Sequence, residues 1–337
     1  MTHLAIGDFV YQRAFLHAFK QRHPNLQLDI WIDDCRTRSK SWHVGRNCTL
    51  VQWLASEDYI QQIYPIASSA QHRGKLLSDA RACHYDLIIF NASQRAEQYA
   101  KFARQIGPDA FIIGTKPNHF SLRSWWYFRQ INKYYLDLPN APTKHISQHY
   151  QDRFYALLGI KVDEKQRLYP ITIPREFQDK ADKFLTKSSH QIQRTIFINH
   201  LSTTIKRDYS WEKLRALLLG LADIHPLSQF IVNTPPAQYA QVCQQLKEDD
   251  ALRTLDISPF TATHFFELPA IINASDLIIT VETAIMHIAS SLHKKQIVLM
   301  RESAKAWAPL GEAYILYGGR RVDSIEVSDV LRVAAQI

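Results

Sequence analysis

The residues with the most chemical potential lie in the segment Asn273–Leu299, which reads NASDLIITVETAIMHIASSLHKKQIVL. An apolar run typical of a buried strand ends at a polar turn containing Glu282 and Thr283, and a helix-like segment follows. Small residues at a helix start leave its first N–H groups open, and with the helix dipole they form an anion site suited to a diphosphate. Glu282 could accept hydrogen bonds from ribose or sugar hydroxyls, and His287, one turn further, could reach the phosphate. The alternative is that Thr283 only caps the helix and that His287 is structural.

A second polar cluster follows another strand-like run, within Phe197–Leu214 (FINHLSTTIKRDYSWEKL). Three hydroxyl side chains are followed by two positive charges, and together they could hold a phosphate chain without a metal. The residues concerned are Ser202, Thr203, Thr204, Lys206 and Arg207. The alternative is a capped loop whose basic side chains are solvated. Two loops of this kind in one half of the chain favour the anion site.

Asp8 is the candidate for proton transfer near the start of the chain. We expect a strand to end at Ile6–Asp8 and an amphipathic helix to follow, so that Asp8 lies at the carboxyl end of a strand. A carboxylate there could take the proton from an attacking hydroxyl within hydrogen-bond reach. The alternative is that Asp8 caps the following helix.

The stretch Lys116–Tyr135 (KPNHFSLRSWWYFRQINKYY) combines basic and aromatic residues and contains no acid. Lys116, Arg123 and Arg129 could contact an anionic glycolipid or lipid phosphates, while the aromatic rings lie at a headgroup boundary. Stacking on RNA bases is a second possibility. The third is an ordinary helix with its aromatic rings packed inward.

These residues need a scaffold, and short strand-like runs separated by helical stretches predict an α/β fold with parallel sheets. The runs are Leu26–Ile32, Asp86–Phe90, Ala110–Ile113, Thr195–Ile198, Gln229–Asn233, Leu277–Val281 and Gln296–Met300. The charged, proline-bearing segment Asp163–Pro174 is the expected link between two domains. We place these domains at residues 1–168 and 169–337, with the last helix expected to pack back on the first domain.

Composition narrows the function classes. The 337 residues are 46% hydrophobic and 21% charged, which is ordinary for a folded globular protein, and the net charge of +8 suggests an anionic partner. The sequence contains no G-x-G-x-x-G, P-loop, H-E-x-x-H, G-x-S-x-G or D-x-D pattern, which disfavours dinucleotide, P-loop and metal-dependent chemistry. Its four cysteines are far apart without a C-x-x-C. This cysteine pattern fits a reducing cytosol. We also expect no signal peptide and no membrane span.

Four segments in order resemble landmarks of glycosyltransferase family 9, the bacterial lipopolysaccharide heptosyltransferases. They read IGDFVYQRAFLHAFKQRHP, YDLIIFNASQ, NHLSTTIKRDYSWEKL and SDLIITVETAIMHIASSLHKKQIVLM, and the resemblance runs from Ile6 to about Pro309. It implies the GT-B architecture, in which two Rossmann-like domains face each other across a cleft, and a reaction without a metal or other cofactor. The first domain would bind the acceptor and the second the nucleotide-sugar donor.

Carried over by position, the resemblance makes Asp8 the catalytic base and implies inversion at the anomeric carbon. The donor diphosphate would be held by Ser202, Thr203, Thr204 and Lys206 from one loop. Thr283, Ala284 and Ile285 would hold it from the helix start, with Glu282 and His287 beside it. These groups would stabilise charge on the departing nucleotide diphosphate.

Three departures from the family pattern bear on specificity. The family's Asp-Thr-Gly reads Glu282-Thr283-Ala284 here, which adds bulk at the donor pocket. The usual Thr and Pro are absent from the helix after Asp8. Where the family often has a ribose-binding Glu, this chain reads NTPPAQYAQ, and Gln238 is the nearest candidate.

The resemblance therefore implies transfer of a sugar, heptose from ADP-heptose, to the inner core of lipopolysaccharide or lipooligosaccharide. The acceptor would be an anionic glycolipid contacted by Lys116, Arg123 and Arg129, and the enzyme would sit transiently on the anionic cytoplasmic face of the inner membrane. One alternative is another nucleotide sugar, such as a UDP-hexose. A more distant alternative is a basic nucleic-acid-binding protein, although no RNA-binding motif is present.

Overall fold

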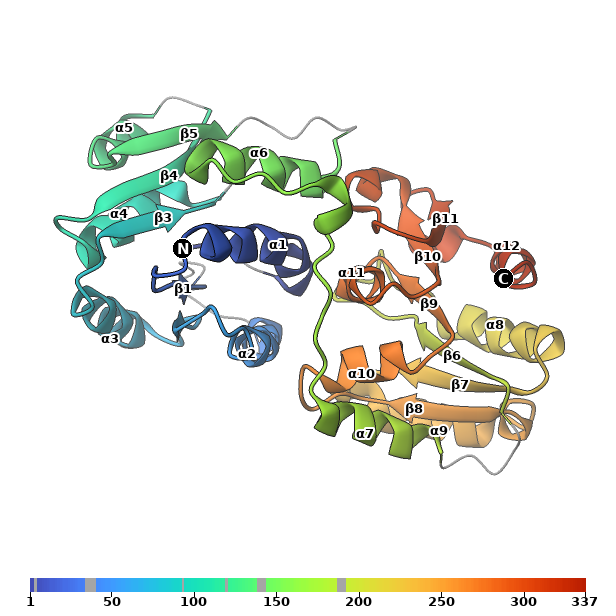
Figure 1. Ribbon diagram of the computed structural model, residues 1–337. Helices are drawn as coiled ribbons and strands as arrows, with labels where there is room; N and C mark the ends of the chain where they lie inside the picture. The colour runs from blue at the N-terminus through green and yellow to red at the C-terminus, as the bar shows by residue number, and fades with distance from the viewer. Residues whose placement is uncertain (3–4, 34–40, 93, 119–120, 138–143, 187–191) are drawn as a thin grey trace. The chain divides into compact units, whose positions relative to one another are not determined.

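The computed structural model describes residues 1–2, 5–33, 41–92, 94–118, 121–137, 144–186 and 192–337 (Figure 1). The chain divides into two compact units, Met1–Arg167 and Leu168–Ile337. The division falls one residue before the boundary expected from the sequence, inside the charged, proline-bearing segment. Both units consist of helices and parallel sheets, as the sequence predicted.

The first unit contains two separate parallel sheets. One pairs β1 (Asp29–Trp31) with β2 (Gln62–Tyr64), and the other has the order β3 (Leu87–Phe90), β4 (Phe111–Pro117), β5 (Lys133–Asp137). A single parallel bridge joins Thr2 to Asn91. The helices are α1 (Ile6–Arg22), α2 (Ser41–Leu54), α3 (Ala70–Arg81), α4 (Ala96–Ile106), α5 (Leu122–Phe128) and α6 (Ile146–Leu158).

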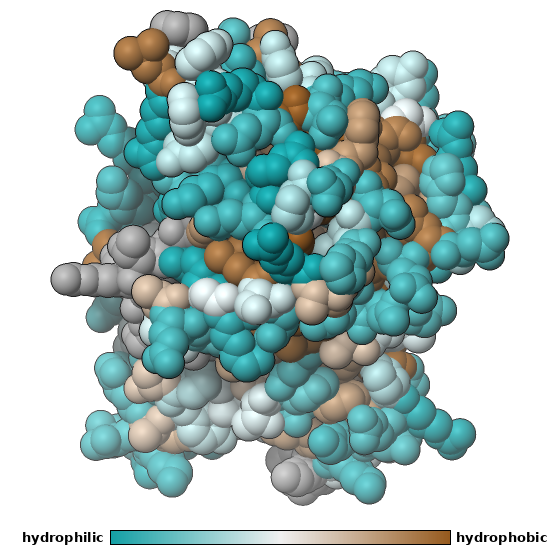
Figure 2. All heavy atoms as spheres, turned by 90° about the vertical axis from the view of Figure 1, so that its left-hand side faces the viewer, coloured by the Kyte–Doolittle hydropathy of each residue, from teal (hydrophilic) through white to brown (hydrophobic). Residues whose placement is uncertain are grey.

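The molecular face drawn in Figure 2 is mostly hydrophilic, and hydrophobic residues appear on it in separate patches. No described helix is both long enough and apolar enough to cross a membrane.

The second unit contains one continuous sheet of six parallel strands. Its order is β11 (Ala313–Gly318), β10 (Gln296–Arg301), β9 (Leu277–Val281), β6 (Arg194–Asn199), β7 (Ser228–Asn233), β8 (Asp256–Phe260). The helices are α7 (Arg175–Leu185), α8 (Trp211–Ile224), α9 (Tyr239–Glu248), α10 (Glu267–Asn273), α11 (Ala284–Ser291) and α12 (Val327–Ala334). Every residue of β9 is buried, which explains why the strand is apolar apart from Thr280.

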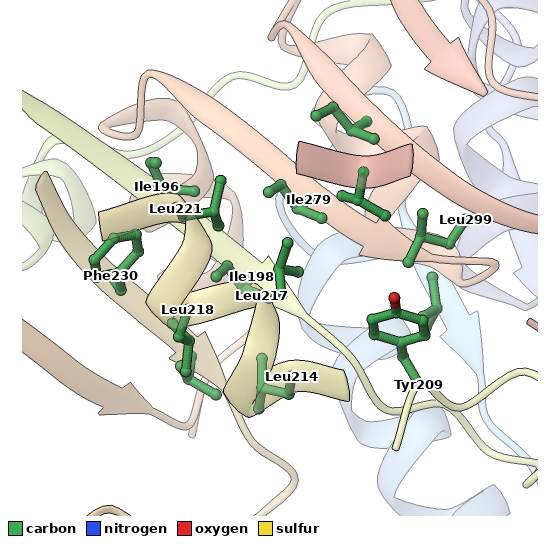
Figure 3. Packing of buried hydrophobic residues seen from close by; sticks show 14 of the residues in the cluster. Ile196, Ile198, Tyr209, Leu214, Leu217, Leu218, Leu221, Phe230, Ile279 and Leu299 are labelled. Atoms are coloured by element: carbon green, nitrogen blue, oxygen red, sulfur yellow. The ribbon is translucent and has the colours of Figure 1, made fainter. Parts of the chain in front are cut away.

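The core of the second unit lies between this sheet and α8 (Figure 3). Leu214, Leu217, Leu218 and Leu221 recur at helical spacing and form one buried face of α8. That face packs over side chains of the central strands, which include Ile196, Ile198, Phe230 and Ile279. The same α8 also contacts α12.

One expectation about the start of the chain needs correction. The residues Ile6–Asp8 do not end a strand, because α1 begins at Ile6 and Asp8 lies in its first turn. Asp8 accepts a hydrogen bond from the backbone N–H of Ala5 (2.9 Å), which satisfies a donor at the helix end. The last helix, α12, contacts α8, β10 and β11 of the second unit.

Four strands were not foreseen from the sequence: β2, β5, β8 and β11. β2 has three residues, too few for a periodic pattern. β8 contains a proline and is only half-buried, as suits the edge of a sheet. β5 and β11 are also edge strands, with exposed residues that mask their alternation.

Candidate active site

Polar side chains meet at the carboxyl ends of the central strands in the second unit. Asn233, the last residue of β7, donates its amide to Asn199 Oδ1 (2.8 Å). Asn199, the last residue of β6, donates in turn to Thr280 Oγ1 (3.1 Å) and Thr283 Oγ1 (3.3 Å). Because parallel strands end at the same edge, this chain of hydrogen bonds joins β6, β7 and the turn after β9. Neither asparagine was recognised from the sequence, although each ends a strand with an apolar run.

Glu282 lies at the same edge and forms a two-point ion pair. Its carboxylate accepts hydrogen bonds from Arg301 Nη2 (2.7 Å) and Nε (3.0 Å), and Glu282 is 7% exposed. This pairing raises the pKa of Arg301. Arg301 ends β10 and was not recognised in the sequence. The predicted acceptor for sugar hydroxyls is thus a carboxylate already oriented by an arginine, with lone pairs left for further hydrogen bonds.

The start of α11 has the geometry expected for an anion-binding helix terminus. Thr283 caps the helix, and its Oγ1 accepts the N–H of Ile285 (3.3 Å). Thr283 and Ala284 are both partly exposed, so solvent reaches the first turn. His287 is 3% exposed and lies 6.2 Å from the Trp307 ring between centroids. Its burial agrees better with the structural alternative than with direct contact to a phosphate.

The loop Ser202–Asp208 lies against this turn, and Arg207 connects the two. Its guanidinium donates to Thr203 Oγ1 (2.7 Å), to Thr204 Oγ1 (3.0 Å) and to the backbone carbonyl of Glu282 (3.5 Å). Within the loop, the Ser202 hydroxyl donates to the Thr204 carbonyl and accepts the Thr204 N–H. The structure thus brings together the two polar loops that the sequence analysis singled out.

Lys206 and Gln238 lie at the surface of the second unit. Lys206 is exposed, and its backbone carbonyl accepts the N–H of Val322 (3.0 Å). Gln238 ends the 3₁₀ turn Pro236–Gln238 that follows β7, and it is exposed. Arg207, rather than Lys206, is therefore the basic side chain that contacts both loops.

Asp8 in the first unit is held by two hydrogen bonds. One oxygen accepts the Ala5 N–H, and the other accepts the hydroxyl of Tyr150 on α6 at 2.6 Å. Tyr150 is buried, and its burial together with the Asp8 charge raises its pKa well above the ordinary value. Tyr150 therefore stays protonated and donates to Asp8. The two residues are 142 positions apart, so no sequence pattern pointed to this pair.

The basic aromatic stretch forms the end of β4, helix α5 and β5. The two Trp rings of α5 are about half exposed, at 54% for Trp125 and 50% for Trp126. The Arg129 guanidinium lies 3.5 Å from the Trp126 ring centroid, and Lys116 Nζ lies 4.7 Å from that of Tyr134. Arg123 is exposed beside Tyr127. The expectation of an ordinary helix with inward aromatic rings is therefore wrong for both Trp rings.

Lys116 and Trp125 also line a cavity of about 260 Å³ together with Ser121, Ser124 and Leu136. No group of three or more His, Cys, Asp or Glu side chains within the described ranges could hold a metal ion.

Comparison with known proteins supplies the class and then the family. The chain superposes on a family 9 glycosyltransferase from Veillonella parvula with a TM-score of 0.73 at 17% identity, covering 99% of this chain and 95% of that one. For the E. coli ADP-heptose lps heptosyltransferase II the TM-score is 0.72 at 13% identity, with 99% and 97% covered. For E. coli heptosyltransferase WaaC with ADP it is 0.68 at 12% identity, with 100% and 99% covered. The fold is thus the GT-B fold of glycosyltransferases.

The family model described as glycosyltransferase family 9 (heptosyltransferase) matches residues 110–330. This chain is a glycosyltransferase that belongs to family 9. The match contains both polar loops of the second unit and leaves Asp8 outside it. No match was found among curated proteins.

Proposed function

We propose that this glycosyltransferase moves heptose from ADP-heptose to the inner core of lipopolysaccharide or lipooligosaccharide, with inversion and without a metal. The observation that carries the proposal is the junction of the two polar loops through Arg207 at the start of α11. Two of the similar structures are described with ADP or ADP-heptose in their names, which favours an adenine nucleotide.

The donor diphosphate would bind across this junction. The first N–H groups of α11, at Ala284 and Ile285, and the positive end of its dipole favour negative charge. Arg207, the Thr203 and Thr204 hydroxyls and exposed Lys206 would contact the phosphate oxygens. As the bond from the anomeric carbon to the diphosphate breaks, these groups stabilise the charge that develops on the leaving group. Glu282, oriented by Arg301, would accept hydrogen bonds from donor hydroxyls, and Gln238 would contact the nucleotide.

Asp8 would serve as the general base. The acceptor hydroxyl attacks the anomeric carbon from the face opposite the diphosphate, and its proton passes to the Asp8 carboxylate. The Tyr150 hydroxyl donates a hydrogen bond to the Asp8 carboxylate and orients it. Tyr150 on α6 thus fixes the position of a base that lies on helix α1.

The acceptor would be an anionic glycolipid presented at the cytoplasmic face of the inner membrane. Exposed Trp125 and Trp126, with Lys116, Arg123 and Arg129 around them, combine positive charge with amphipathic rings. Such a surface favours transient contact with lipid phosphates at the headgroup boundary.

A thermal-shift panel with ADP, UDP, GDP and CMP tests the donor, because a ligand that binds only the folded state raises Tm with concentration. Selective stabilisation by ADP is expected, followed by heptose transfer to heptose-deficient core lipid. Selective stabilisation by UDP would replace the donor with a UDP-hexose, an alternative favoured by the extra bulk of Glu282 and Ala284. No shift with any nucleotide would contradict the transferase site.

Arg207→Gln tests the diphosphate site directly. We expect a weaker ADP shift and a raised KM for the donor, because Arg207 is the charged side chain shared by both loops. Arg253→Gln is the matched control. Arg253 lies in the 3₁₀ turn Leu252–Thr254 shortly before β8 begins at Asp256, so it lies near the amino edge of the sheet, away from the junction. Equal effects of the two substitutions would contradict the assignment.

A further inference from the structure

The ion pair of Arg301 and Glu282 lies at the carboxyl ends of two neighbouring strands, next to the start of α11. Arg301 ends β10, and Glu282 directly follows β9, which pairs with β10 in parallel. Glu282 also directly precedes Thr283, the residue that caps α11. The pair therefore lies at the edge where α/β sheets bind their ligands, beside the proposed diphosphate site.

The carboxylate of Glu282 has little hydrogen-bonding capacity left for a ligand. An ionised carboxylate offers about four lone-pair sites. Arg301 occupies both sites of Oε2, through its backbone N–H (3.3 Å) and Nε (3.0 Å), and one site of Oε1, through Nη2 (2.7 Å). A single acceptor site, on Oε1, remains for a sugar hydroxyl.

The guanidinium of Arg301, in contrast, keeps most of its donors. Glu282 takes the edge of the planar group that is formed by Nε and Nη2. The opposite edge, formed by Nη1 and the second N–H of Nη2, has no hydrogen-bond partner among the described residues. The Arg301 side chain is 24% exposed, so this edge is open to a ligand.

The surroundings make this open edge a defined recognition group. Glu282 is 7% exposed and holds the guanidinium at two points, which fixes the plane of the fork before a ligand binds. Little side-chain entropy is then lost when the ligand arrives. Arg207 reaches the same turn and donates to the backbone carbonyl of Glu282 (3.5 Å). Two arginines and one carboxylate leave the turn positive and rich in donors, which favours a ligand that presents oxygen acceptors.

We propose that Arg301 determines which sugar the site accepts, by donating from its open edge to two adjacent oxygen atoms of the transferred sugar. The free site on Glu282 Oε1 would accept one sugar hydroxyl. This inference rests on the proposed function, because it places the sugar beside a diphosphate at the start of α11. Adjacent sugar oxygens suit the parallel donors of a guanidinium fork. A site built in this way should reject a sugar that lacks one of these oxygens, because its buried donors would then stay unpaired.

Binding of the full chain to a nucleotide and to the matching nucleotide sugar tests this role. The ratio of the Kd for ADP to the Kd for ADP-heptose measures the contribution of the sugar, and UDP with UDP-glucose gives a second pair. Arg301→Gln should lower this ratio by about 10-fold or more, because hydrogen bonds from a charged donor are lost. The Kd for the nucleotide alone should stay unchanged.

Arg301→Lys separates the fork from its charge. Lysine keeps a positive charge beside Glu282 but has no second edge of N–H donors. We expect its Tm to stay close to that of the unsubstituted protein, while the sugar contribution falls as in Arg301→Gln. Arg253→Gln, the same exchange near the amino edge of the sheet, is the control and should leave both Kd values unchanged.

The inference is overturned if Arg301→Lys retains the full sugar contribution, because charge without a fork would then suffice. Equal weakening of ADP and ADP-heptose in both Arg301 variants would also overturn it, since Arg301 would then act on the diphosphate or on the fold of the turn. Nucleotide binding without any sugar contribution in the unsubstituted protein would contradict this inference alone. Absence of binding by every nucleotide would contradict the proposed function as well.

Discussion

The two units build the same kind of layered α/β structure with different degrees of continuity. In the second, six strands form one sheet, and polar residues at their carboxyl ends are linked by hydrogen bonds and an ion pair. In the first, the strands form two sheets with a cavity of about 630 Å³ along their edges. A continuous sheet aligns strand ends, so nearby loops meet without further support. In the first unit, where the sheet is interrupted, the candidate base Asp8 is oriented by a side chain of α6.

The largest effect should come from Asp8→Asn, which keeps the shape of the side chain and removes the base. Transfer should fall by about 10²- to 10⁴-fold. The ADP-induced rise in Tm should remain, because the donor groups lie in the other unit. Turnover and thermal shift measured on the same preparation test this, with exposed Asp109→Asn as control. Full turnover by Asp8→Asn would exclude Asp8 as the base.

Ion pairs give the next comparison. Arg13 and Glu57 pair at 2.6 Å in the first unit, with side chains 4% and 6% exposed. Glu57→Gln should destabilise the protein by about 3–5 kcal/mol, because it removes the carboxylate from a buried ion pair. Glu282→Gln should cost only about 1–3 kcal/mol, since the Arg301 side chain is 24% exposed. Urea unfolding measures the loss of stability in each variant. A larger loss for Glu282→Gln than for Glu57→Gln would show that burial of the ion pair does not determine the loss.

A pair of core truncations tests the cavity. Ile279→Ala, in the packed core of the second unit, should cost about 2–5 kcal/mol. Ile88→Ala, which lines the cavity, should cost less, because part of its surface already lacks packing partners. Denaturant unfolding, with hydrogen exchange to report each unit separately, gives the two values. Equal losses of stability in the two variants would mean that the walls of the cavity are as well packed as the core of the second unit.

The smallest expected effects concern pH. Burial lowers the pKa of the Met1 amine from 8.0 to about 5 and that of His200 below 6.5. In both cases the unfolded chain binds the proton more readily, so stability falls as pH decreases. The loss is at most about 1.4 kcal/mol per pH unit for each group. It should begin below about pH 8 in the first unit and below about pH 6.5 in the second.

Hydrogen exchange in each unit between pH 5.5 and 8.5 measures this difference. His200→Gln should flatten the response of the second unit alone. A change in the first unit with that substitution would contradict the assignment.

Much of the second unit could be predicted from sequence. The run SDLIITV followed by ETAIMHIASSL specified a buried strand, a polar turn and a helix, and β9 and α11 occupy those positions. The family resemblance rested on the same segments. Edge strands were missed, because half-buried residues and a proline in β8 weaken the hydrophobic signal that marks a central strand.

The secondary structure around Asp8 was also predicted wrongly from a local hydrophobic pattern. Ile6–Asp8 has an apolar start that suits a strand, but the Asp8 carboxylate accepts the Ala5 N–H and so favours the first turn of a helix.

The sequence by itself determined the α/β class, the central strands and the two polar loops of the donor side, because local hydrophobic pattern and turn chemistry encode them. Only the tertiary structure decided which side chains meet. Tyr150 reaches Asp8 across 142 positions, Arg301 orients Glu282 from the next strand, and Arg207 joins the two loops. Such pairs depend on the order of strands in a sheet and on helix packing, which no short stretch of sequence specifies.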